Sequence, residues 1–405
     1  MTVLSVHSDP PSASATAGLP DAGALLGVYR QPPMDIVRGS GVELFDADGK
    51  SYIDFTSGIG VNALGYADPG IAQAMRDAME SGVLHTSNLY FTPPARRLAG
   101  ELTRLSSLSK AFFCNSGAEA NEGAFKFARR WAREIGGPAK HEIIAIRGSF
   151  HGRLFASLAA TDRPHYRAPF RPLAGGVSVV ERDSRSLECA LNGETAAALI
   201  VEPVQGESGI RVLDPGFLKE LRALTSERGV ALIFDEIQCG LGRTGWLFAH
   251  QRAGIVPDLL TLAKPLAGGL PMGAVLVSSH IADTIRPGDH GTTFGGGPFV
   301  SSVALHVLQR LTDPALLEKV RETGEWLGEA INGISQRTRR IRAVRGIGYM
   351  WGLDVMQPAG DVIARAREAG LLLVSAGEHT VRILPPLVAG REDLARGLEL
   401  LENVL

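Results

Sequence analysis

Two kinds of hydrophobic pattern alternate along the middle of the chain. From about residue 95 to 280, short apolar runs alternate with longer stretches that have a single apolar face. Runs that are apolar throughout are typical of strands covered on both faces of a sheet. The pattern predicts strands at Lys110–Cys114, Glu142–Ile146, Ala197–Val201, Val230–Phe234 and Gly273–Val277.

Helix start and stop signals lie between these runs. Ser116 is followed three residues later by Glu119, a capping box that opens a helical run. Asp214 and Pro215 form a second start signal, and Gly229 is the matching stop signal. Such strand–helix alternation predicts an α/β fold with a mostly parallel sheet.

The last hundred residues follow a different pattern. Asp313 and Pro314 begin a long helix, residues 342–355 form a strand-like segment, residues 380–386 form another strand, and a final helix begins near Glu392. These elements predict a separate α+β unit. Residues 41–55 predict a hairpin, because Asp48-Gly49 stands between two alternating runs. The hairpin could join the C-terminal unit, although no local pattern decides this.

Composition and charge narrow the functional classes. Hydrophobic residues make up 45% of the 405 residues and the formal net charge is -2, so no basic field favours nucleic acid or a membrane surface. No apolar run is long enough to span a bilayer, and the N-terminus does not have the pattern of a secretory signal. The three cysteines form no spaced framework, and the histidines have no metal-ligand spacing. We therefore expect a cytoplasmic protein without a metal site.

A carboxylate and a lysine occupy positions suited to chemistry. Asp235 ends an apolar strand, which is the edge where open α/β sheets bind ligands, although an ordinary capping carboxylate is an equal alternative. Lys264 lies between an apolar run and a glycine-rich turn. Taken alone it is more simply a lysine that reaches solvent, but a desolvated lysine can also act as a nucleophile toward an aldehyde.

A possible phosphate-binding site opens the helix at residue 116. The Ser116 hydroxyl and the amides of Gly117 and Ala118 stand at the positive end of that helix, although an ordinary cap would look the same. Pyridoxal phosphate needs a lysine for its aldehyde, an acid for its ring nitrogen and such a helix start for its phosphate. The sequence therefore predicts pyridoxal phosphate as the cofactor.

With these motifs in place, the chain resembles the class III (ornithine-type) aminotransferases from about Tyr29 to the C-terminus. The landmarks are HTSNLYF, FFCNSGAEANEGAFKFAR, SFHGR, EPVQGESG, IFDEIQCGLGRTG, TLAKPLAGGLPMGA, HGTTFGGGP and VRILPPL. The resemblance implies a fold-type I architecture and a homodimer with active sites at the subunit interface. It implies a flexible tail over residues 1–28, a small domain formed by residues 29–75 and 299–405, and a large cofactor-binding domain over residues 76–298.

The resemblance also assigns roles around the cofactor. Lys264 would carry it, Asp235 would pair with the ring nitrogen, Gln238 would reach the ring hydroxyl and Phe150 would stack on the ring. Ser116, Gly117 and Ala118 would hold the phosphate, and Thr293 would reach it from the neighbouring subunit.

On the substrate side, Arg153 would bind the α-carboxylate and Thr292 would lie nearby. Glu207 and Arg382 would pair, which would hide the arginine from one substrate and free it for glutamate. Several positions depart from the family pattern: Pro265 follows the lysine where glycine or alanine is usual, Gly297 stands where asparagine is usual, and Ser208 replaces a usual glycine. Leu154 and Cys239 each stand where threonine is common.

HTSNLYF is most like the branch of the family that uses N-acetylornithine. The resemblance thus implies amino transfer from N-acetylornithine to 2-oxoglutarate, a step of arginine biosynthesis. Ornithine, succinylornithine, 4-aminobutyrate and carrier-bound aminoadipate semialdehyde remain alternative substrates, and a related protein without catalysis also remains open. A more remote alternative is a nicotinamide-dependent dehydrogenase, because residues 240–245 have the spacing G-x-G-x-x-G.

Overall fold

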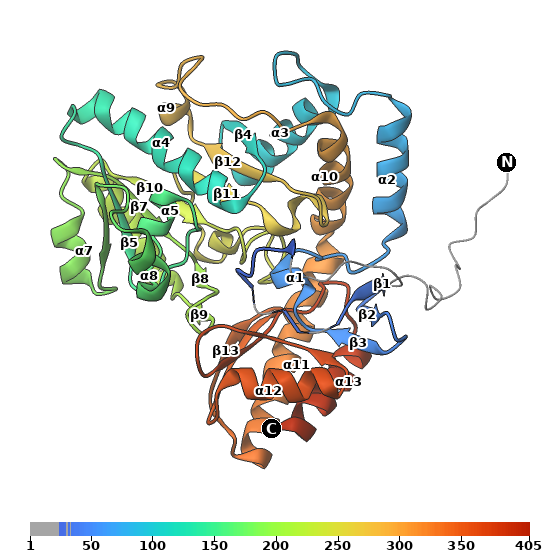
Figure 1. Cartoon of the computed structure of the whole chain (residues 1–405). Coiled ribbons are helices and arrows are strands. Elements are labelled where there is room, and N and C mark those ends of the chain that lie inside the picture. The colour runs from blue at the N-terminus through green and yellow to red at the C-terminus, as the bar shows by residue number, and fades with distance from the viewer. Residues whose placement is uncertain (1–23, 30, 33) are drawn as a thin grey trace.

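The structure is a computed structural model that describes residues 24–29, 31–32 and 34–405. Residues 1–23, most of the expected N-terminal tail, lie outside that range. Figure 1 shows a larger part around a central sheet and a smaller part below it, which contains both the early strands and the C-terminus. In the described residues, no helix has the length and apolar character needed to cross a membrane.

A seven-stranded sheet forms the centre of the larger part, in the order β4-β12-β11-β10-β7-β5-β6. Every strand is parallel to its neighbours except β12, which is antiparallel to both β11 and β4. The predicted mostly parallel α/β sheet is confirmed. Its strands are β4 (Lys110–Cys114), β5 (Glu142–Ile146), β6 (Val177–Val180), β7 (Ala196–Val201), β10 (Ala231–Asp235), β11 (Leu259–Leu262) and β12 (Gly273–Val277).

Both faces of this sheet are covered, which explains why its strands are apolar throughout. In β10, Leu232 and Phe234 belong to one apolar cluster, and Ala231 and Ile233 belong to the other. The first cluster includes side chains of α3 (Pro93–Ser106) and α8 (Pro215–Glu227), and the second includes side chains of α4 (Gly117–Gly136). Successive strand residues point to opposite faces, so each face buries its own set.

The remaining elements of the larger part are short connections and outer helices. Asp214 caps α8 as predicted, because its carboxylate accepts hydrogen bonds from the amides of Gly216 and Phe217. The bounds are α1 (Ser57–Gly60), α2 (Pro69–Glu80), α5 (Phe155–Ala159), α6 (Pro164–Arg167), η2 (Ala168–Phe170), α7 (Ser184–Ala190), β8 (Val204–Gln205), β9 (Arg211–Val212), η3 (Ala249–Ala253), η4 (Lys264–Ala267), α9 (Ser279–Ala282) and α10 (Pro298–Leu311).

The smaller part combines the two ends of the chain. The predicted hairpin is present, and its second strand pairs in parallel with β15, so the hairpin does join the C-terminal unit. One sheet has the order β1-β2-β3-β15 and the other has the order β13-β14-β17-β16. Bounds are β1 (Ile36–Ser40), β2 (Glu43–Asp46), β3 (Ser51–Asp54), α11 (Pro314–Thr338), β13 (Ile341–Ile347), β14 (Met350–Val355), α12 (Ala359–Glu368), β15 (Leu371–Leu372), β16 (Val374–Ser375), β17 (Thr380–Ile383) and α13 (Arg391–Val404).

The strand-like segment at 342–355 needs a correction. It forms two antiparallel strands, β13 and β14, which meet at a turn through Gly348. Gly348 has φ +54, and a Cβ there would lie 2.6 Å from the Arg243 carbonyl oxygen, so only glycine fits the turn. The apolar alternation continues across both strands and hides the reversal in the sequence.

The exact domain borders stay a prediction. The helix α10 begins at Pro298, where the C-terminal unit is expected to begin, yet it packs against α2 and α3 of the larger part. The helix α11 packs against β13 and α13 of the smaller part.

Candidate active site

The predicted lysine and carboxylate meet at one edge of the central sheet. Asp235 is the last residue of β10, and it pairs in register with Thr261 of the parallel neighbour β11. Lys264 follows three residues after Thr261, as the first residue of η4. Parallel strands present their carboxyl ends at the same edge, so this topology brings residues 29 positions apart to one place.

A cavity of about 560 Å³ lies at this edge. Nine of the predicted site residues line it: Ser116, Gly117, Ala118, Phe150, Arg153, Glu207, Asp235, Gln238 and Lys264. Arg382, Thr292 and Thr293 are not part of the lining.

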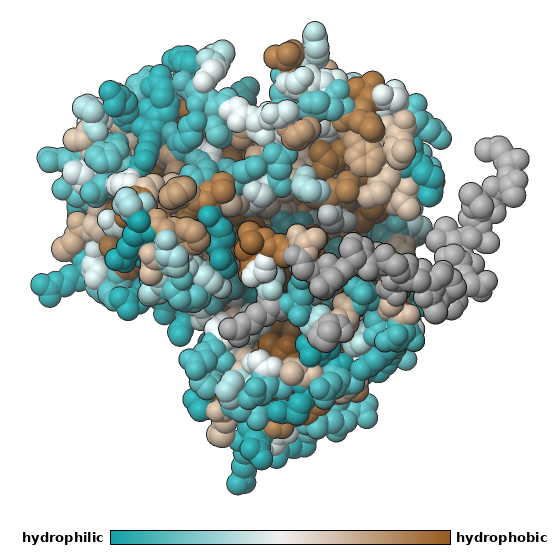
Figure 2. All heavy atoms as spheres, viewed as in Figure 1, coloured by the Kyte–Doolittle hydropathy of each residue, from teal (hydrophilic) through white to brown (hydrophobic). Residues whose placement is uncertain are grey.

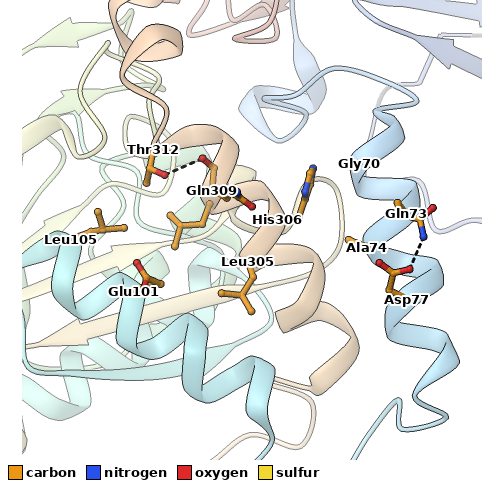
Figure 3. Close-up of a pocket in the computed structure, with 11 residues that line it drawn as sticks. Gly70, Gln73, Ala74, Asp77, Glu101, Leu105, Leu305, His306, Gln309 and Thr312 are labelled. Carbon is orange, nitrogen blue, oxygen red and sulfur yellow. Dashed lines mark hydrogen bonds between the residues drawn. The ribbon is translucent and has the colours of Figure 1, made fainter.

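A larger cavity of about 610 Å³ contains none of the predicted residues. Figure 3 shows this cavity between α2, α3 and α10. Two of its polar side chains already have partners, because the Gln73 amide donates to Asp77 and the Thr312 hydroxyl donates to the Gln309 carbonyl. Size alone therefore does not identify the active site, and the convergence of chemical groups does.

Asp235 is buried and held from three directions. Asn121 Nδ2 donates to Asp235 Oδ2 at 2.8 Å, and His151 Nδ1 lies 2.8 Å from the same oxygen. The amide of Ile237 donates to Asp235 Oδ1 at 3.1 Å. Asn121 is fixed in turn by the Thr261 hydroxyl, which donates to Asn121 Oδ1. These contacts give the carboxylate one fixed orientation.

Sequence reasoning missed Asn121 and assigned His151 no role in the site. His151 is buried, and the partner of its Nδ1 is the central carboxylate of the site. Asn121 lies 114 residues from Asp235, on a helix whose other buried residues are apolar or glycine, so no local pattern reveals its contact.

Glu202 is a third missed residue. It follows β7, is 5% exposed and lines the cavity, and its carboxylate accepts hydrogen bonds from the amides of Phe150 and Gly206. Burial raises the pKa of the Glu202 carboxyl to about 7, although the nearby His151 acts to lower it. The signal that selected Asp235, a carboxylate directly after an apolar strand, would also have selected Glu202.

Lys264 is half-buried on the cavity wall. Burial lowers the pKa of its amine below the ordinary value; Glu207 opposes this shift and Arg382 adds to it. A lowered pKa increases the share of uncharged, nucleophilic amine. Pro265 follows as the second residue of η4, in a first helical turn where a missing N–H costs no hydrogen bond.

The start of α4 forms the opposite wall of the cavity. The Ser116 hydroxyl caps this helix by accepting from the amide of Glu119, as predicted from the capping box. A Cβ at Gly117 would lie 2.8 Å from the Ile237 side chain, so glycine is required for the close approach of the two segments. Gly117 and Ala118, in the first turn of this twenty-residue helix, line the cavity. The amides at the N-terminal end of a helix are a favourable place for an anion.

Glu207 and Arg382 are in contact, as their motifs predicted. Arg382 Nη1 donates to Glu207 Oε1 and, at 3.1 Å each, to Gln238 Oε1 and the Gly206 carbonyl. Arg382 is 1% exposed, whereas Glu207 is half-buried in the loop after β8. Burial opposes the ionisation of Glu207, but Arg382 and Lys264 overcome this effect and hold the pKa of its carboxyl below the ordinary value.

The other predicted residues lie at the mouth of the cavity or beside it. Arg153 is exposed, and its guanidinium carbon lies 3.5 Å from the centre of the Tyr166 ring. Thr292 is next to the lining, because Asn115 Nδ2 donates to its hydroxyl at 3.1 Å. Thr293 is exposed and outside the cavity of this single chain.

The G-x-G-x-x-G segment does not open a helix, so the structure contradicts the dehydrogenase alternative. Residues 240–245 form turns, and the next helical element is η3. Arg243 of this segment is buried and donates to the carbonyls of Tyr349 and Pro385. Its role in the structure is to join the larger part to the smaller one.

The cavity residues fit pyridoxal phosphate. The site combines a lysine with a lowered pKa, a buried and fixed carboxylate, and a helix start where a side chain at residue 117 would collide with Ile237. These are the groups that the aldehyde, the ring nitrogen and the phosphate of this cofactor require.

Comparisons with known proteins agree with this geometry. Residues 27–405 match the model of the family Aminotransferase class-III. The acetylornithine aminotransferase of Methanocaldococcus jannaschii is 42% identical over 94% of this chain and 95% of its own length. The one of Xanthomonas axonopodis pv. citri is 42% identical over 96% of each chain.

Solved structures show the same fold. The N-acetylornithine aminotransferase of Stenotrophomonas maltophilia has a TM-score of 0.81 and 35% identity, over 93% of this chain and 96% of its own. An ornithine aminotransferase of Toxoplasma gondii has a TM-score of 0.91 and 29% identity, over 95% of this chain and 92% of its own. The family model matches nearly the whole described chain, and solved aminotransferases have the same fold. The chain therefore belongs to the class III aminotransferases, fold-type I enzymes that depend on pyridoxal phosphate.

Proposed function

We propose that the chain transfers the amino group of N-acetylornithine to 2-oxoglutarate, which gives N-acetylglutamate semialdehyde and glutamate. The relatives described above support this substrate, since two of them at 42% identity are named acetylornithine aminotransferase. The observation that carries the reaction class is the placement of Lys264 and the fixed Asp235 at the carboxyl edge of adjacent strands, in one cavity with the start of α4.

The chemistry divides between cofactor and protein. Bound pyridoxal phosphate supplies an electron sink for the carbon that loses its proton. Asp235 would hold a proton on the ring nitrogen, and its contacts with Asn121 and His151 keep its carboxylate in place. Lys264 Nζ would hold the aldehyde until the substrate amine displaces it, and would then move the proton of the reacting substrate carbon to the cofactor carbon. Burial favours the uncharged amine that both tasks need.

The other cofactor contacts remain proposals of the same kind. The Ser116 hydroxyl with the Gly117 and Ala118 amides would bind the phosphate, Phe150 would cover the ring, and Gln238 would reach the ring hydroxyl. Gln238 is kept in place by Arg382, which donates to its Oε1 at 3.1 Å.

Two arginines would distinguish the substrates. Arg153, at the mouth of the cavity, offers a planar pair of donors for the α-carboxylate, with Thr292 close by. Arg382 stays paired with Glu207 when the N-acylated donor is bound, because that substrate has no second carboxylate. When 2-oxoglutarate binds, Glu207 moves away and Arg382 receives the second carboxylate.

A screen of single half-reactions tests the substrate. Purified enzyme loaded with pyridoxal phosphate is mixed separately with N-acetylornithine, ornithine, 4-aminobutyrate, succinylornithine and lysine derivatives, while the cofactor absorbance is followed. We expect the fastest spectral change with N-acetylornithine. A faster change with another amine would transfer the proposal to that substrate, and no change with any amine would reject it.

We further propose a homodimer with Thr293 reaching the partner's cofactor phosphate. Exposed apolar side chains gather in the loop between α2 and α3, together with Phe294 beside Thr293. Figure 2 shows apolar atoms at the surface near this loop, at the top of the view. His85 of the loop packs on Phe294, with ring centres 5.1 Å apart. We call this surface the loop patch: Val83, Leu84, Leu89, Tyr90, Phe91 and Phe294.

Such a patch favours association because its burial removes apolar area from water. Phe91 is 88% exposed in the single chain. We expect Phe91→Asp to shift the mass measured by light scattering toward the monomer. Ile135→Asp, an equally drastic change of an exposed residue on α4, should leave the mass unchanged. A monomeric unmodified protein would reject the dimer.

A cytoplasmic location also stays a prediction; the three free thiols suit a reducing compartment.

A further inference from the structure

A second cavity lies behind Glu207, on the side away from Lys264. It has a volume of about 490 Å³ and shares only Glu207 with the lining of the catalytic cavity. It is lined by Arg147, Gly148, Arg163, Glu181, Arg182, Gln205, Glu207, Ser208, Arg211, Ala376 and Gly377.

The central sheet places this cavity where α/β proteins bind ligands. The strands β5 and β6 run in parallel and end in register at Ile146 and Val180. Arg147 and Gly148 directly follow the first strand, and residues 181 and 182 directly follow the second. The cavity is therefore formed at the carboxyl edge of the sheet, next to the catalytic cavity on the same edge.

The charges of the lining favour an anion. Four arginines face two glutamates, and both glutamates already have cationic partners. Arg147 Nη2 lies 2.7 Å from Glu181 Oε1, and Glu207 pairs with Arg382, which lies outside the lining of both cavities. Among the described residues, no carboxylate lies within ion-pair distance of Arg163, Arg182 or Arg211.

Hydrogen bonds hold two of these arginines against the loop that carries Glu207. Arg163 Nη2 donates to the Glu207 carbonyl at 2.6 Å and to the Ser208 hydroxyl at 3.0 Å. Arg211 Nε donates to the Ser208 carbonyl at 3.0 Å. These bonds fix the guanidinium groups without bringing a carboxylate into an ion pair with them. Ser208, a departure from the family pattern, thus takes part in forming this cavity.

A buried acceptor in the same lining adds a second requirement. Gln205 is 1% exposed, and its amide orientation is set because Nε2 donates to the Arg147 carbonyl at 3.0 Å. Its Oε1 is buried and has no hydrogen-bond partner within the described residues. A buried acceptor without a donor costs free energy, so a ligand that brings a donor is favoured there.

We propose that this cavity is a binding site, separate from the catalytic one, for a small oxyanion that also carries a hydrogen-bond donor. Phosphate in its protonated forms has this chemistry. Its oxygens accept from Arg163, Arg182 and Arg211, and its hydroxyl donates to Gln205 Oε1. The ligand binds the loop of Glu207 from behind, without contact with the cofactor.

Calorimetric titration of the enzyme loaded with pyridoxal phosphate tests the site, because the cofactor then fills the catalytic phosphate site. The probes are inorganic phosphate and sulfate near neutral pH. We expect saturable binding of phosphate with one site per chain. Sulfate has a similar shape but no hydroxyl proton, so it should bind about fivefold more weakly. Equal affinities would overturn the role of Gln205.

Two matched variants separate a built site from general surface charge. Arg182→Ala removes a lining arginine whose side chain forms no hydrogen bond or ion pair within the described residues, and it should weaken phosphate binding about tenfold. Arg185→Ala removes the same charge from the exposed side of α7, outside the lining, and should leave the affinity unchanged. Equal effects of the two variants, or no saturable binding to the unmodified enzyme, would overturn the proposal. None of these outcomes depends on which amine is the substrate.

Discussion

Two carboxylates that line the catalytic cavity, Asp235 and Glu207, are held in opposite ways. Asp235 ends a central strand, is 4% exposed and has partners on both oxygens. Glu207 lies in a loop, is half-buried, and its carboxylate depends on contacts with Arg382. A charge that must stay at one atom benefits from a rigid scaffold, whereas a charge that must move between two substrates benefits from a loop and few partners.

The largest effect is expected at Lys264, which lines the same cavity as these two carboxylates. Lys264→Ala removes the amine that we propose holds the cofactor and carries the proton. We expect loss of turnover and of the visible cofactor absorbance. Lys219→Ala, on the exposed face of α8, is the control and should behave like the unmodified enzyme. Retention of both absorbance and activity in the Lys264 variant would contradict the assignment.

Asp235→Ala should give the next largest effect, because it removes the fixed charge. A loss of about a thousandfold in kcat is expected, with part of the cofactor retained through the phosphate contacts. Asn121→Ala leaves the carboxylate but removes one of its supports, and should cost about tenfold. If both variants had the same kcat, the distinction between the Asp235 charge and the Asn121 contact that supports it would be wrong.

Glu207→Ala tests whether the other carboxylate moves. It should leave Arg382 uncovered, so the KM for N-acetylornithine should rise while the KM for 2-oxoglutarate changes by less than about threefold. Glu188→Ala, an exposed glutamate on α7, is the control for loss of charge. Equal changes for the two substrates would remove the switching role and leave Glu207 as a structural partner.

The smallest effect concerns stability and the third carboxylate, Glu202. Burial raises its pKa from the ordinary 4.5 to about 7, so the folded state binds its proton more tightly than the unfolded chain does. This contribution to the free energy of unfolding is complete below pH 4.5 and is lost as pH rises through about 7. The Tm of the unmodified enzyme should therefore fall relative to that of Glu202→Gln across this window. Parallel Tm curves would show that Glu202 is ionised throughout.

The sequence predicted most strands of the central sheet because their signal is local. Burial on both faces requires continuous apolar runs, and β4, β5 and β12 have the predicted bounds. The chain reversal at Gly348 was not predicted because the apolar alternation continues across the turn. The strand β6 was not predicted because it is short and its residues differ in burial, so it gives no clear pattern.

The sequence by itself determined the family, the helix caps and the residues that we propose for the cofactor, since each depends on short motifs whose residue types are set by local chemistry. The tertiary structure decided which side chains support these groups. Asn121 and His151 reach Asp235 from 114 and 84 residues away, and the arginine-lined cavity brings the residues that follow β5 and β6 together with the loop of Glu207. Such contacts follow from the order in which strands join a sheet, and strand order is fixed by the packing of the whole chain and not by any single segment.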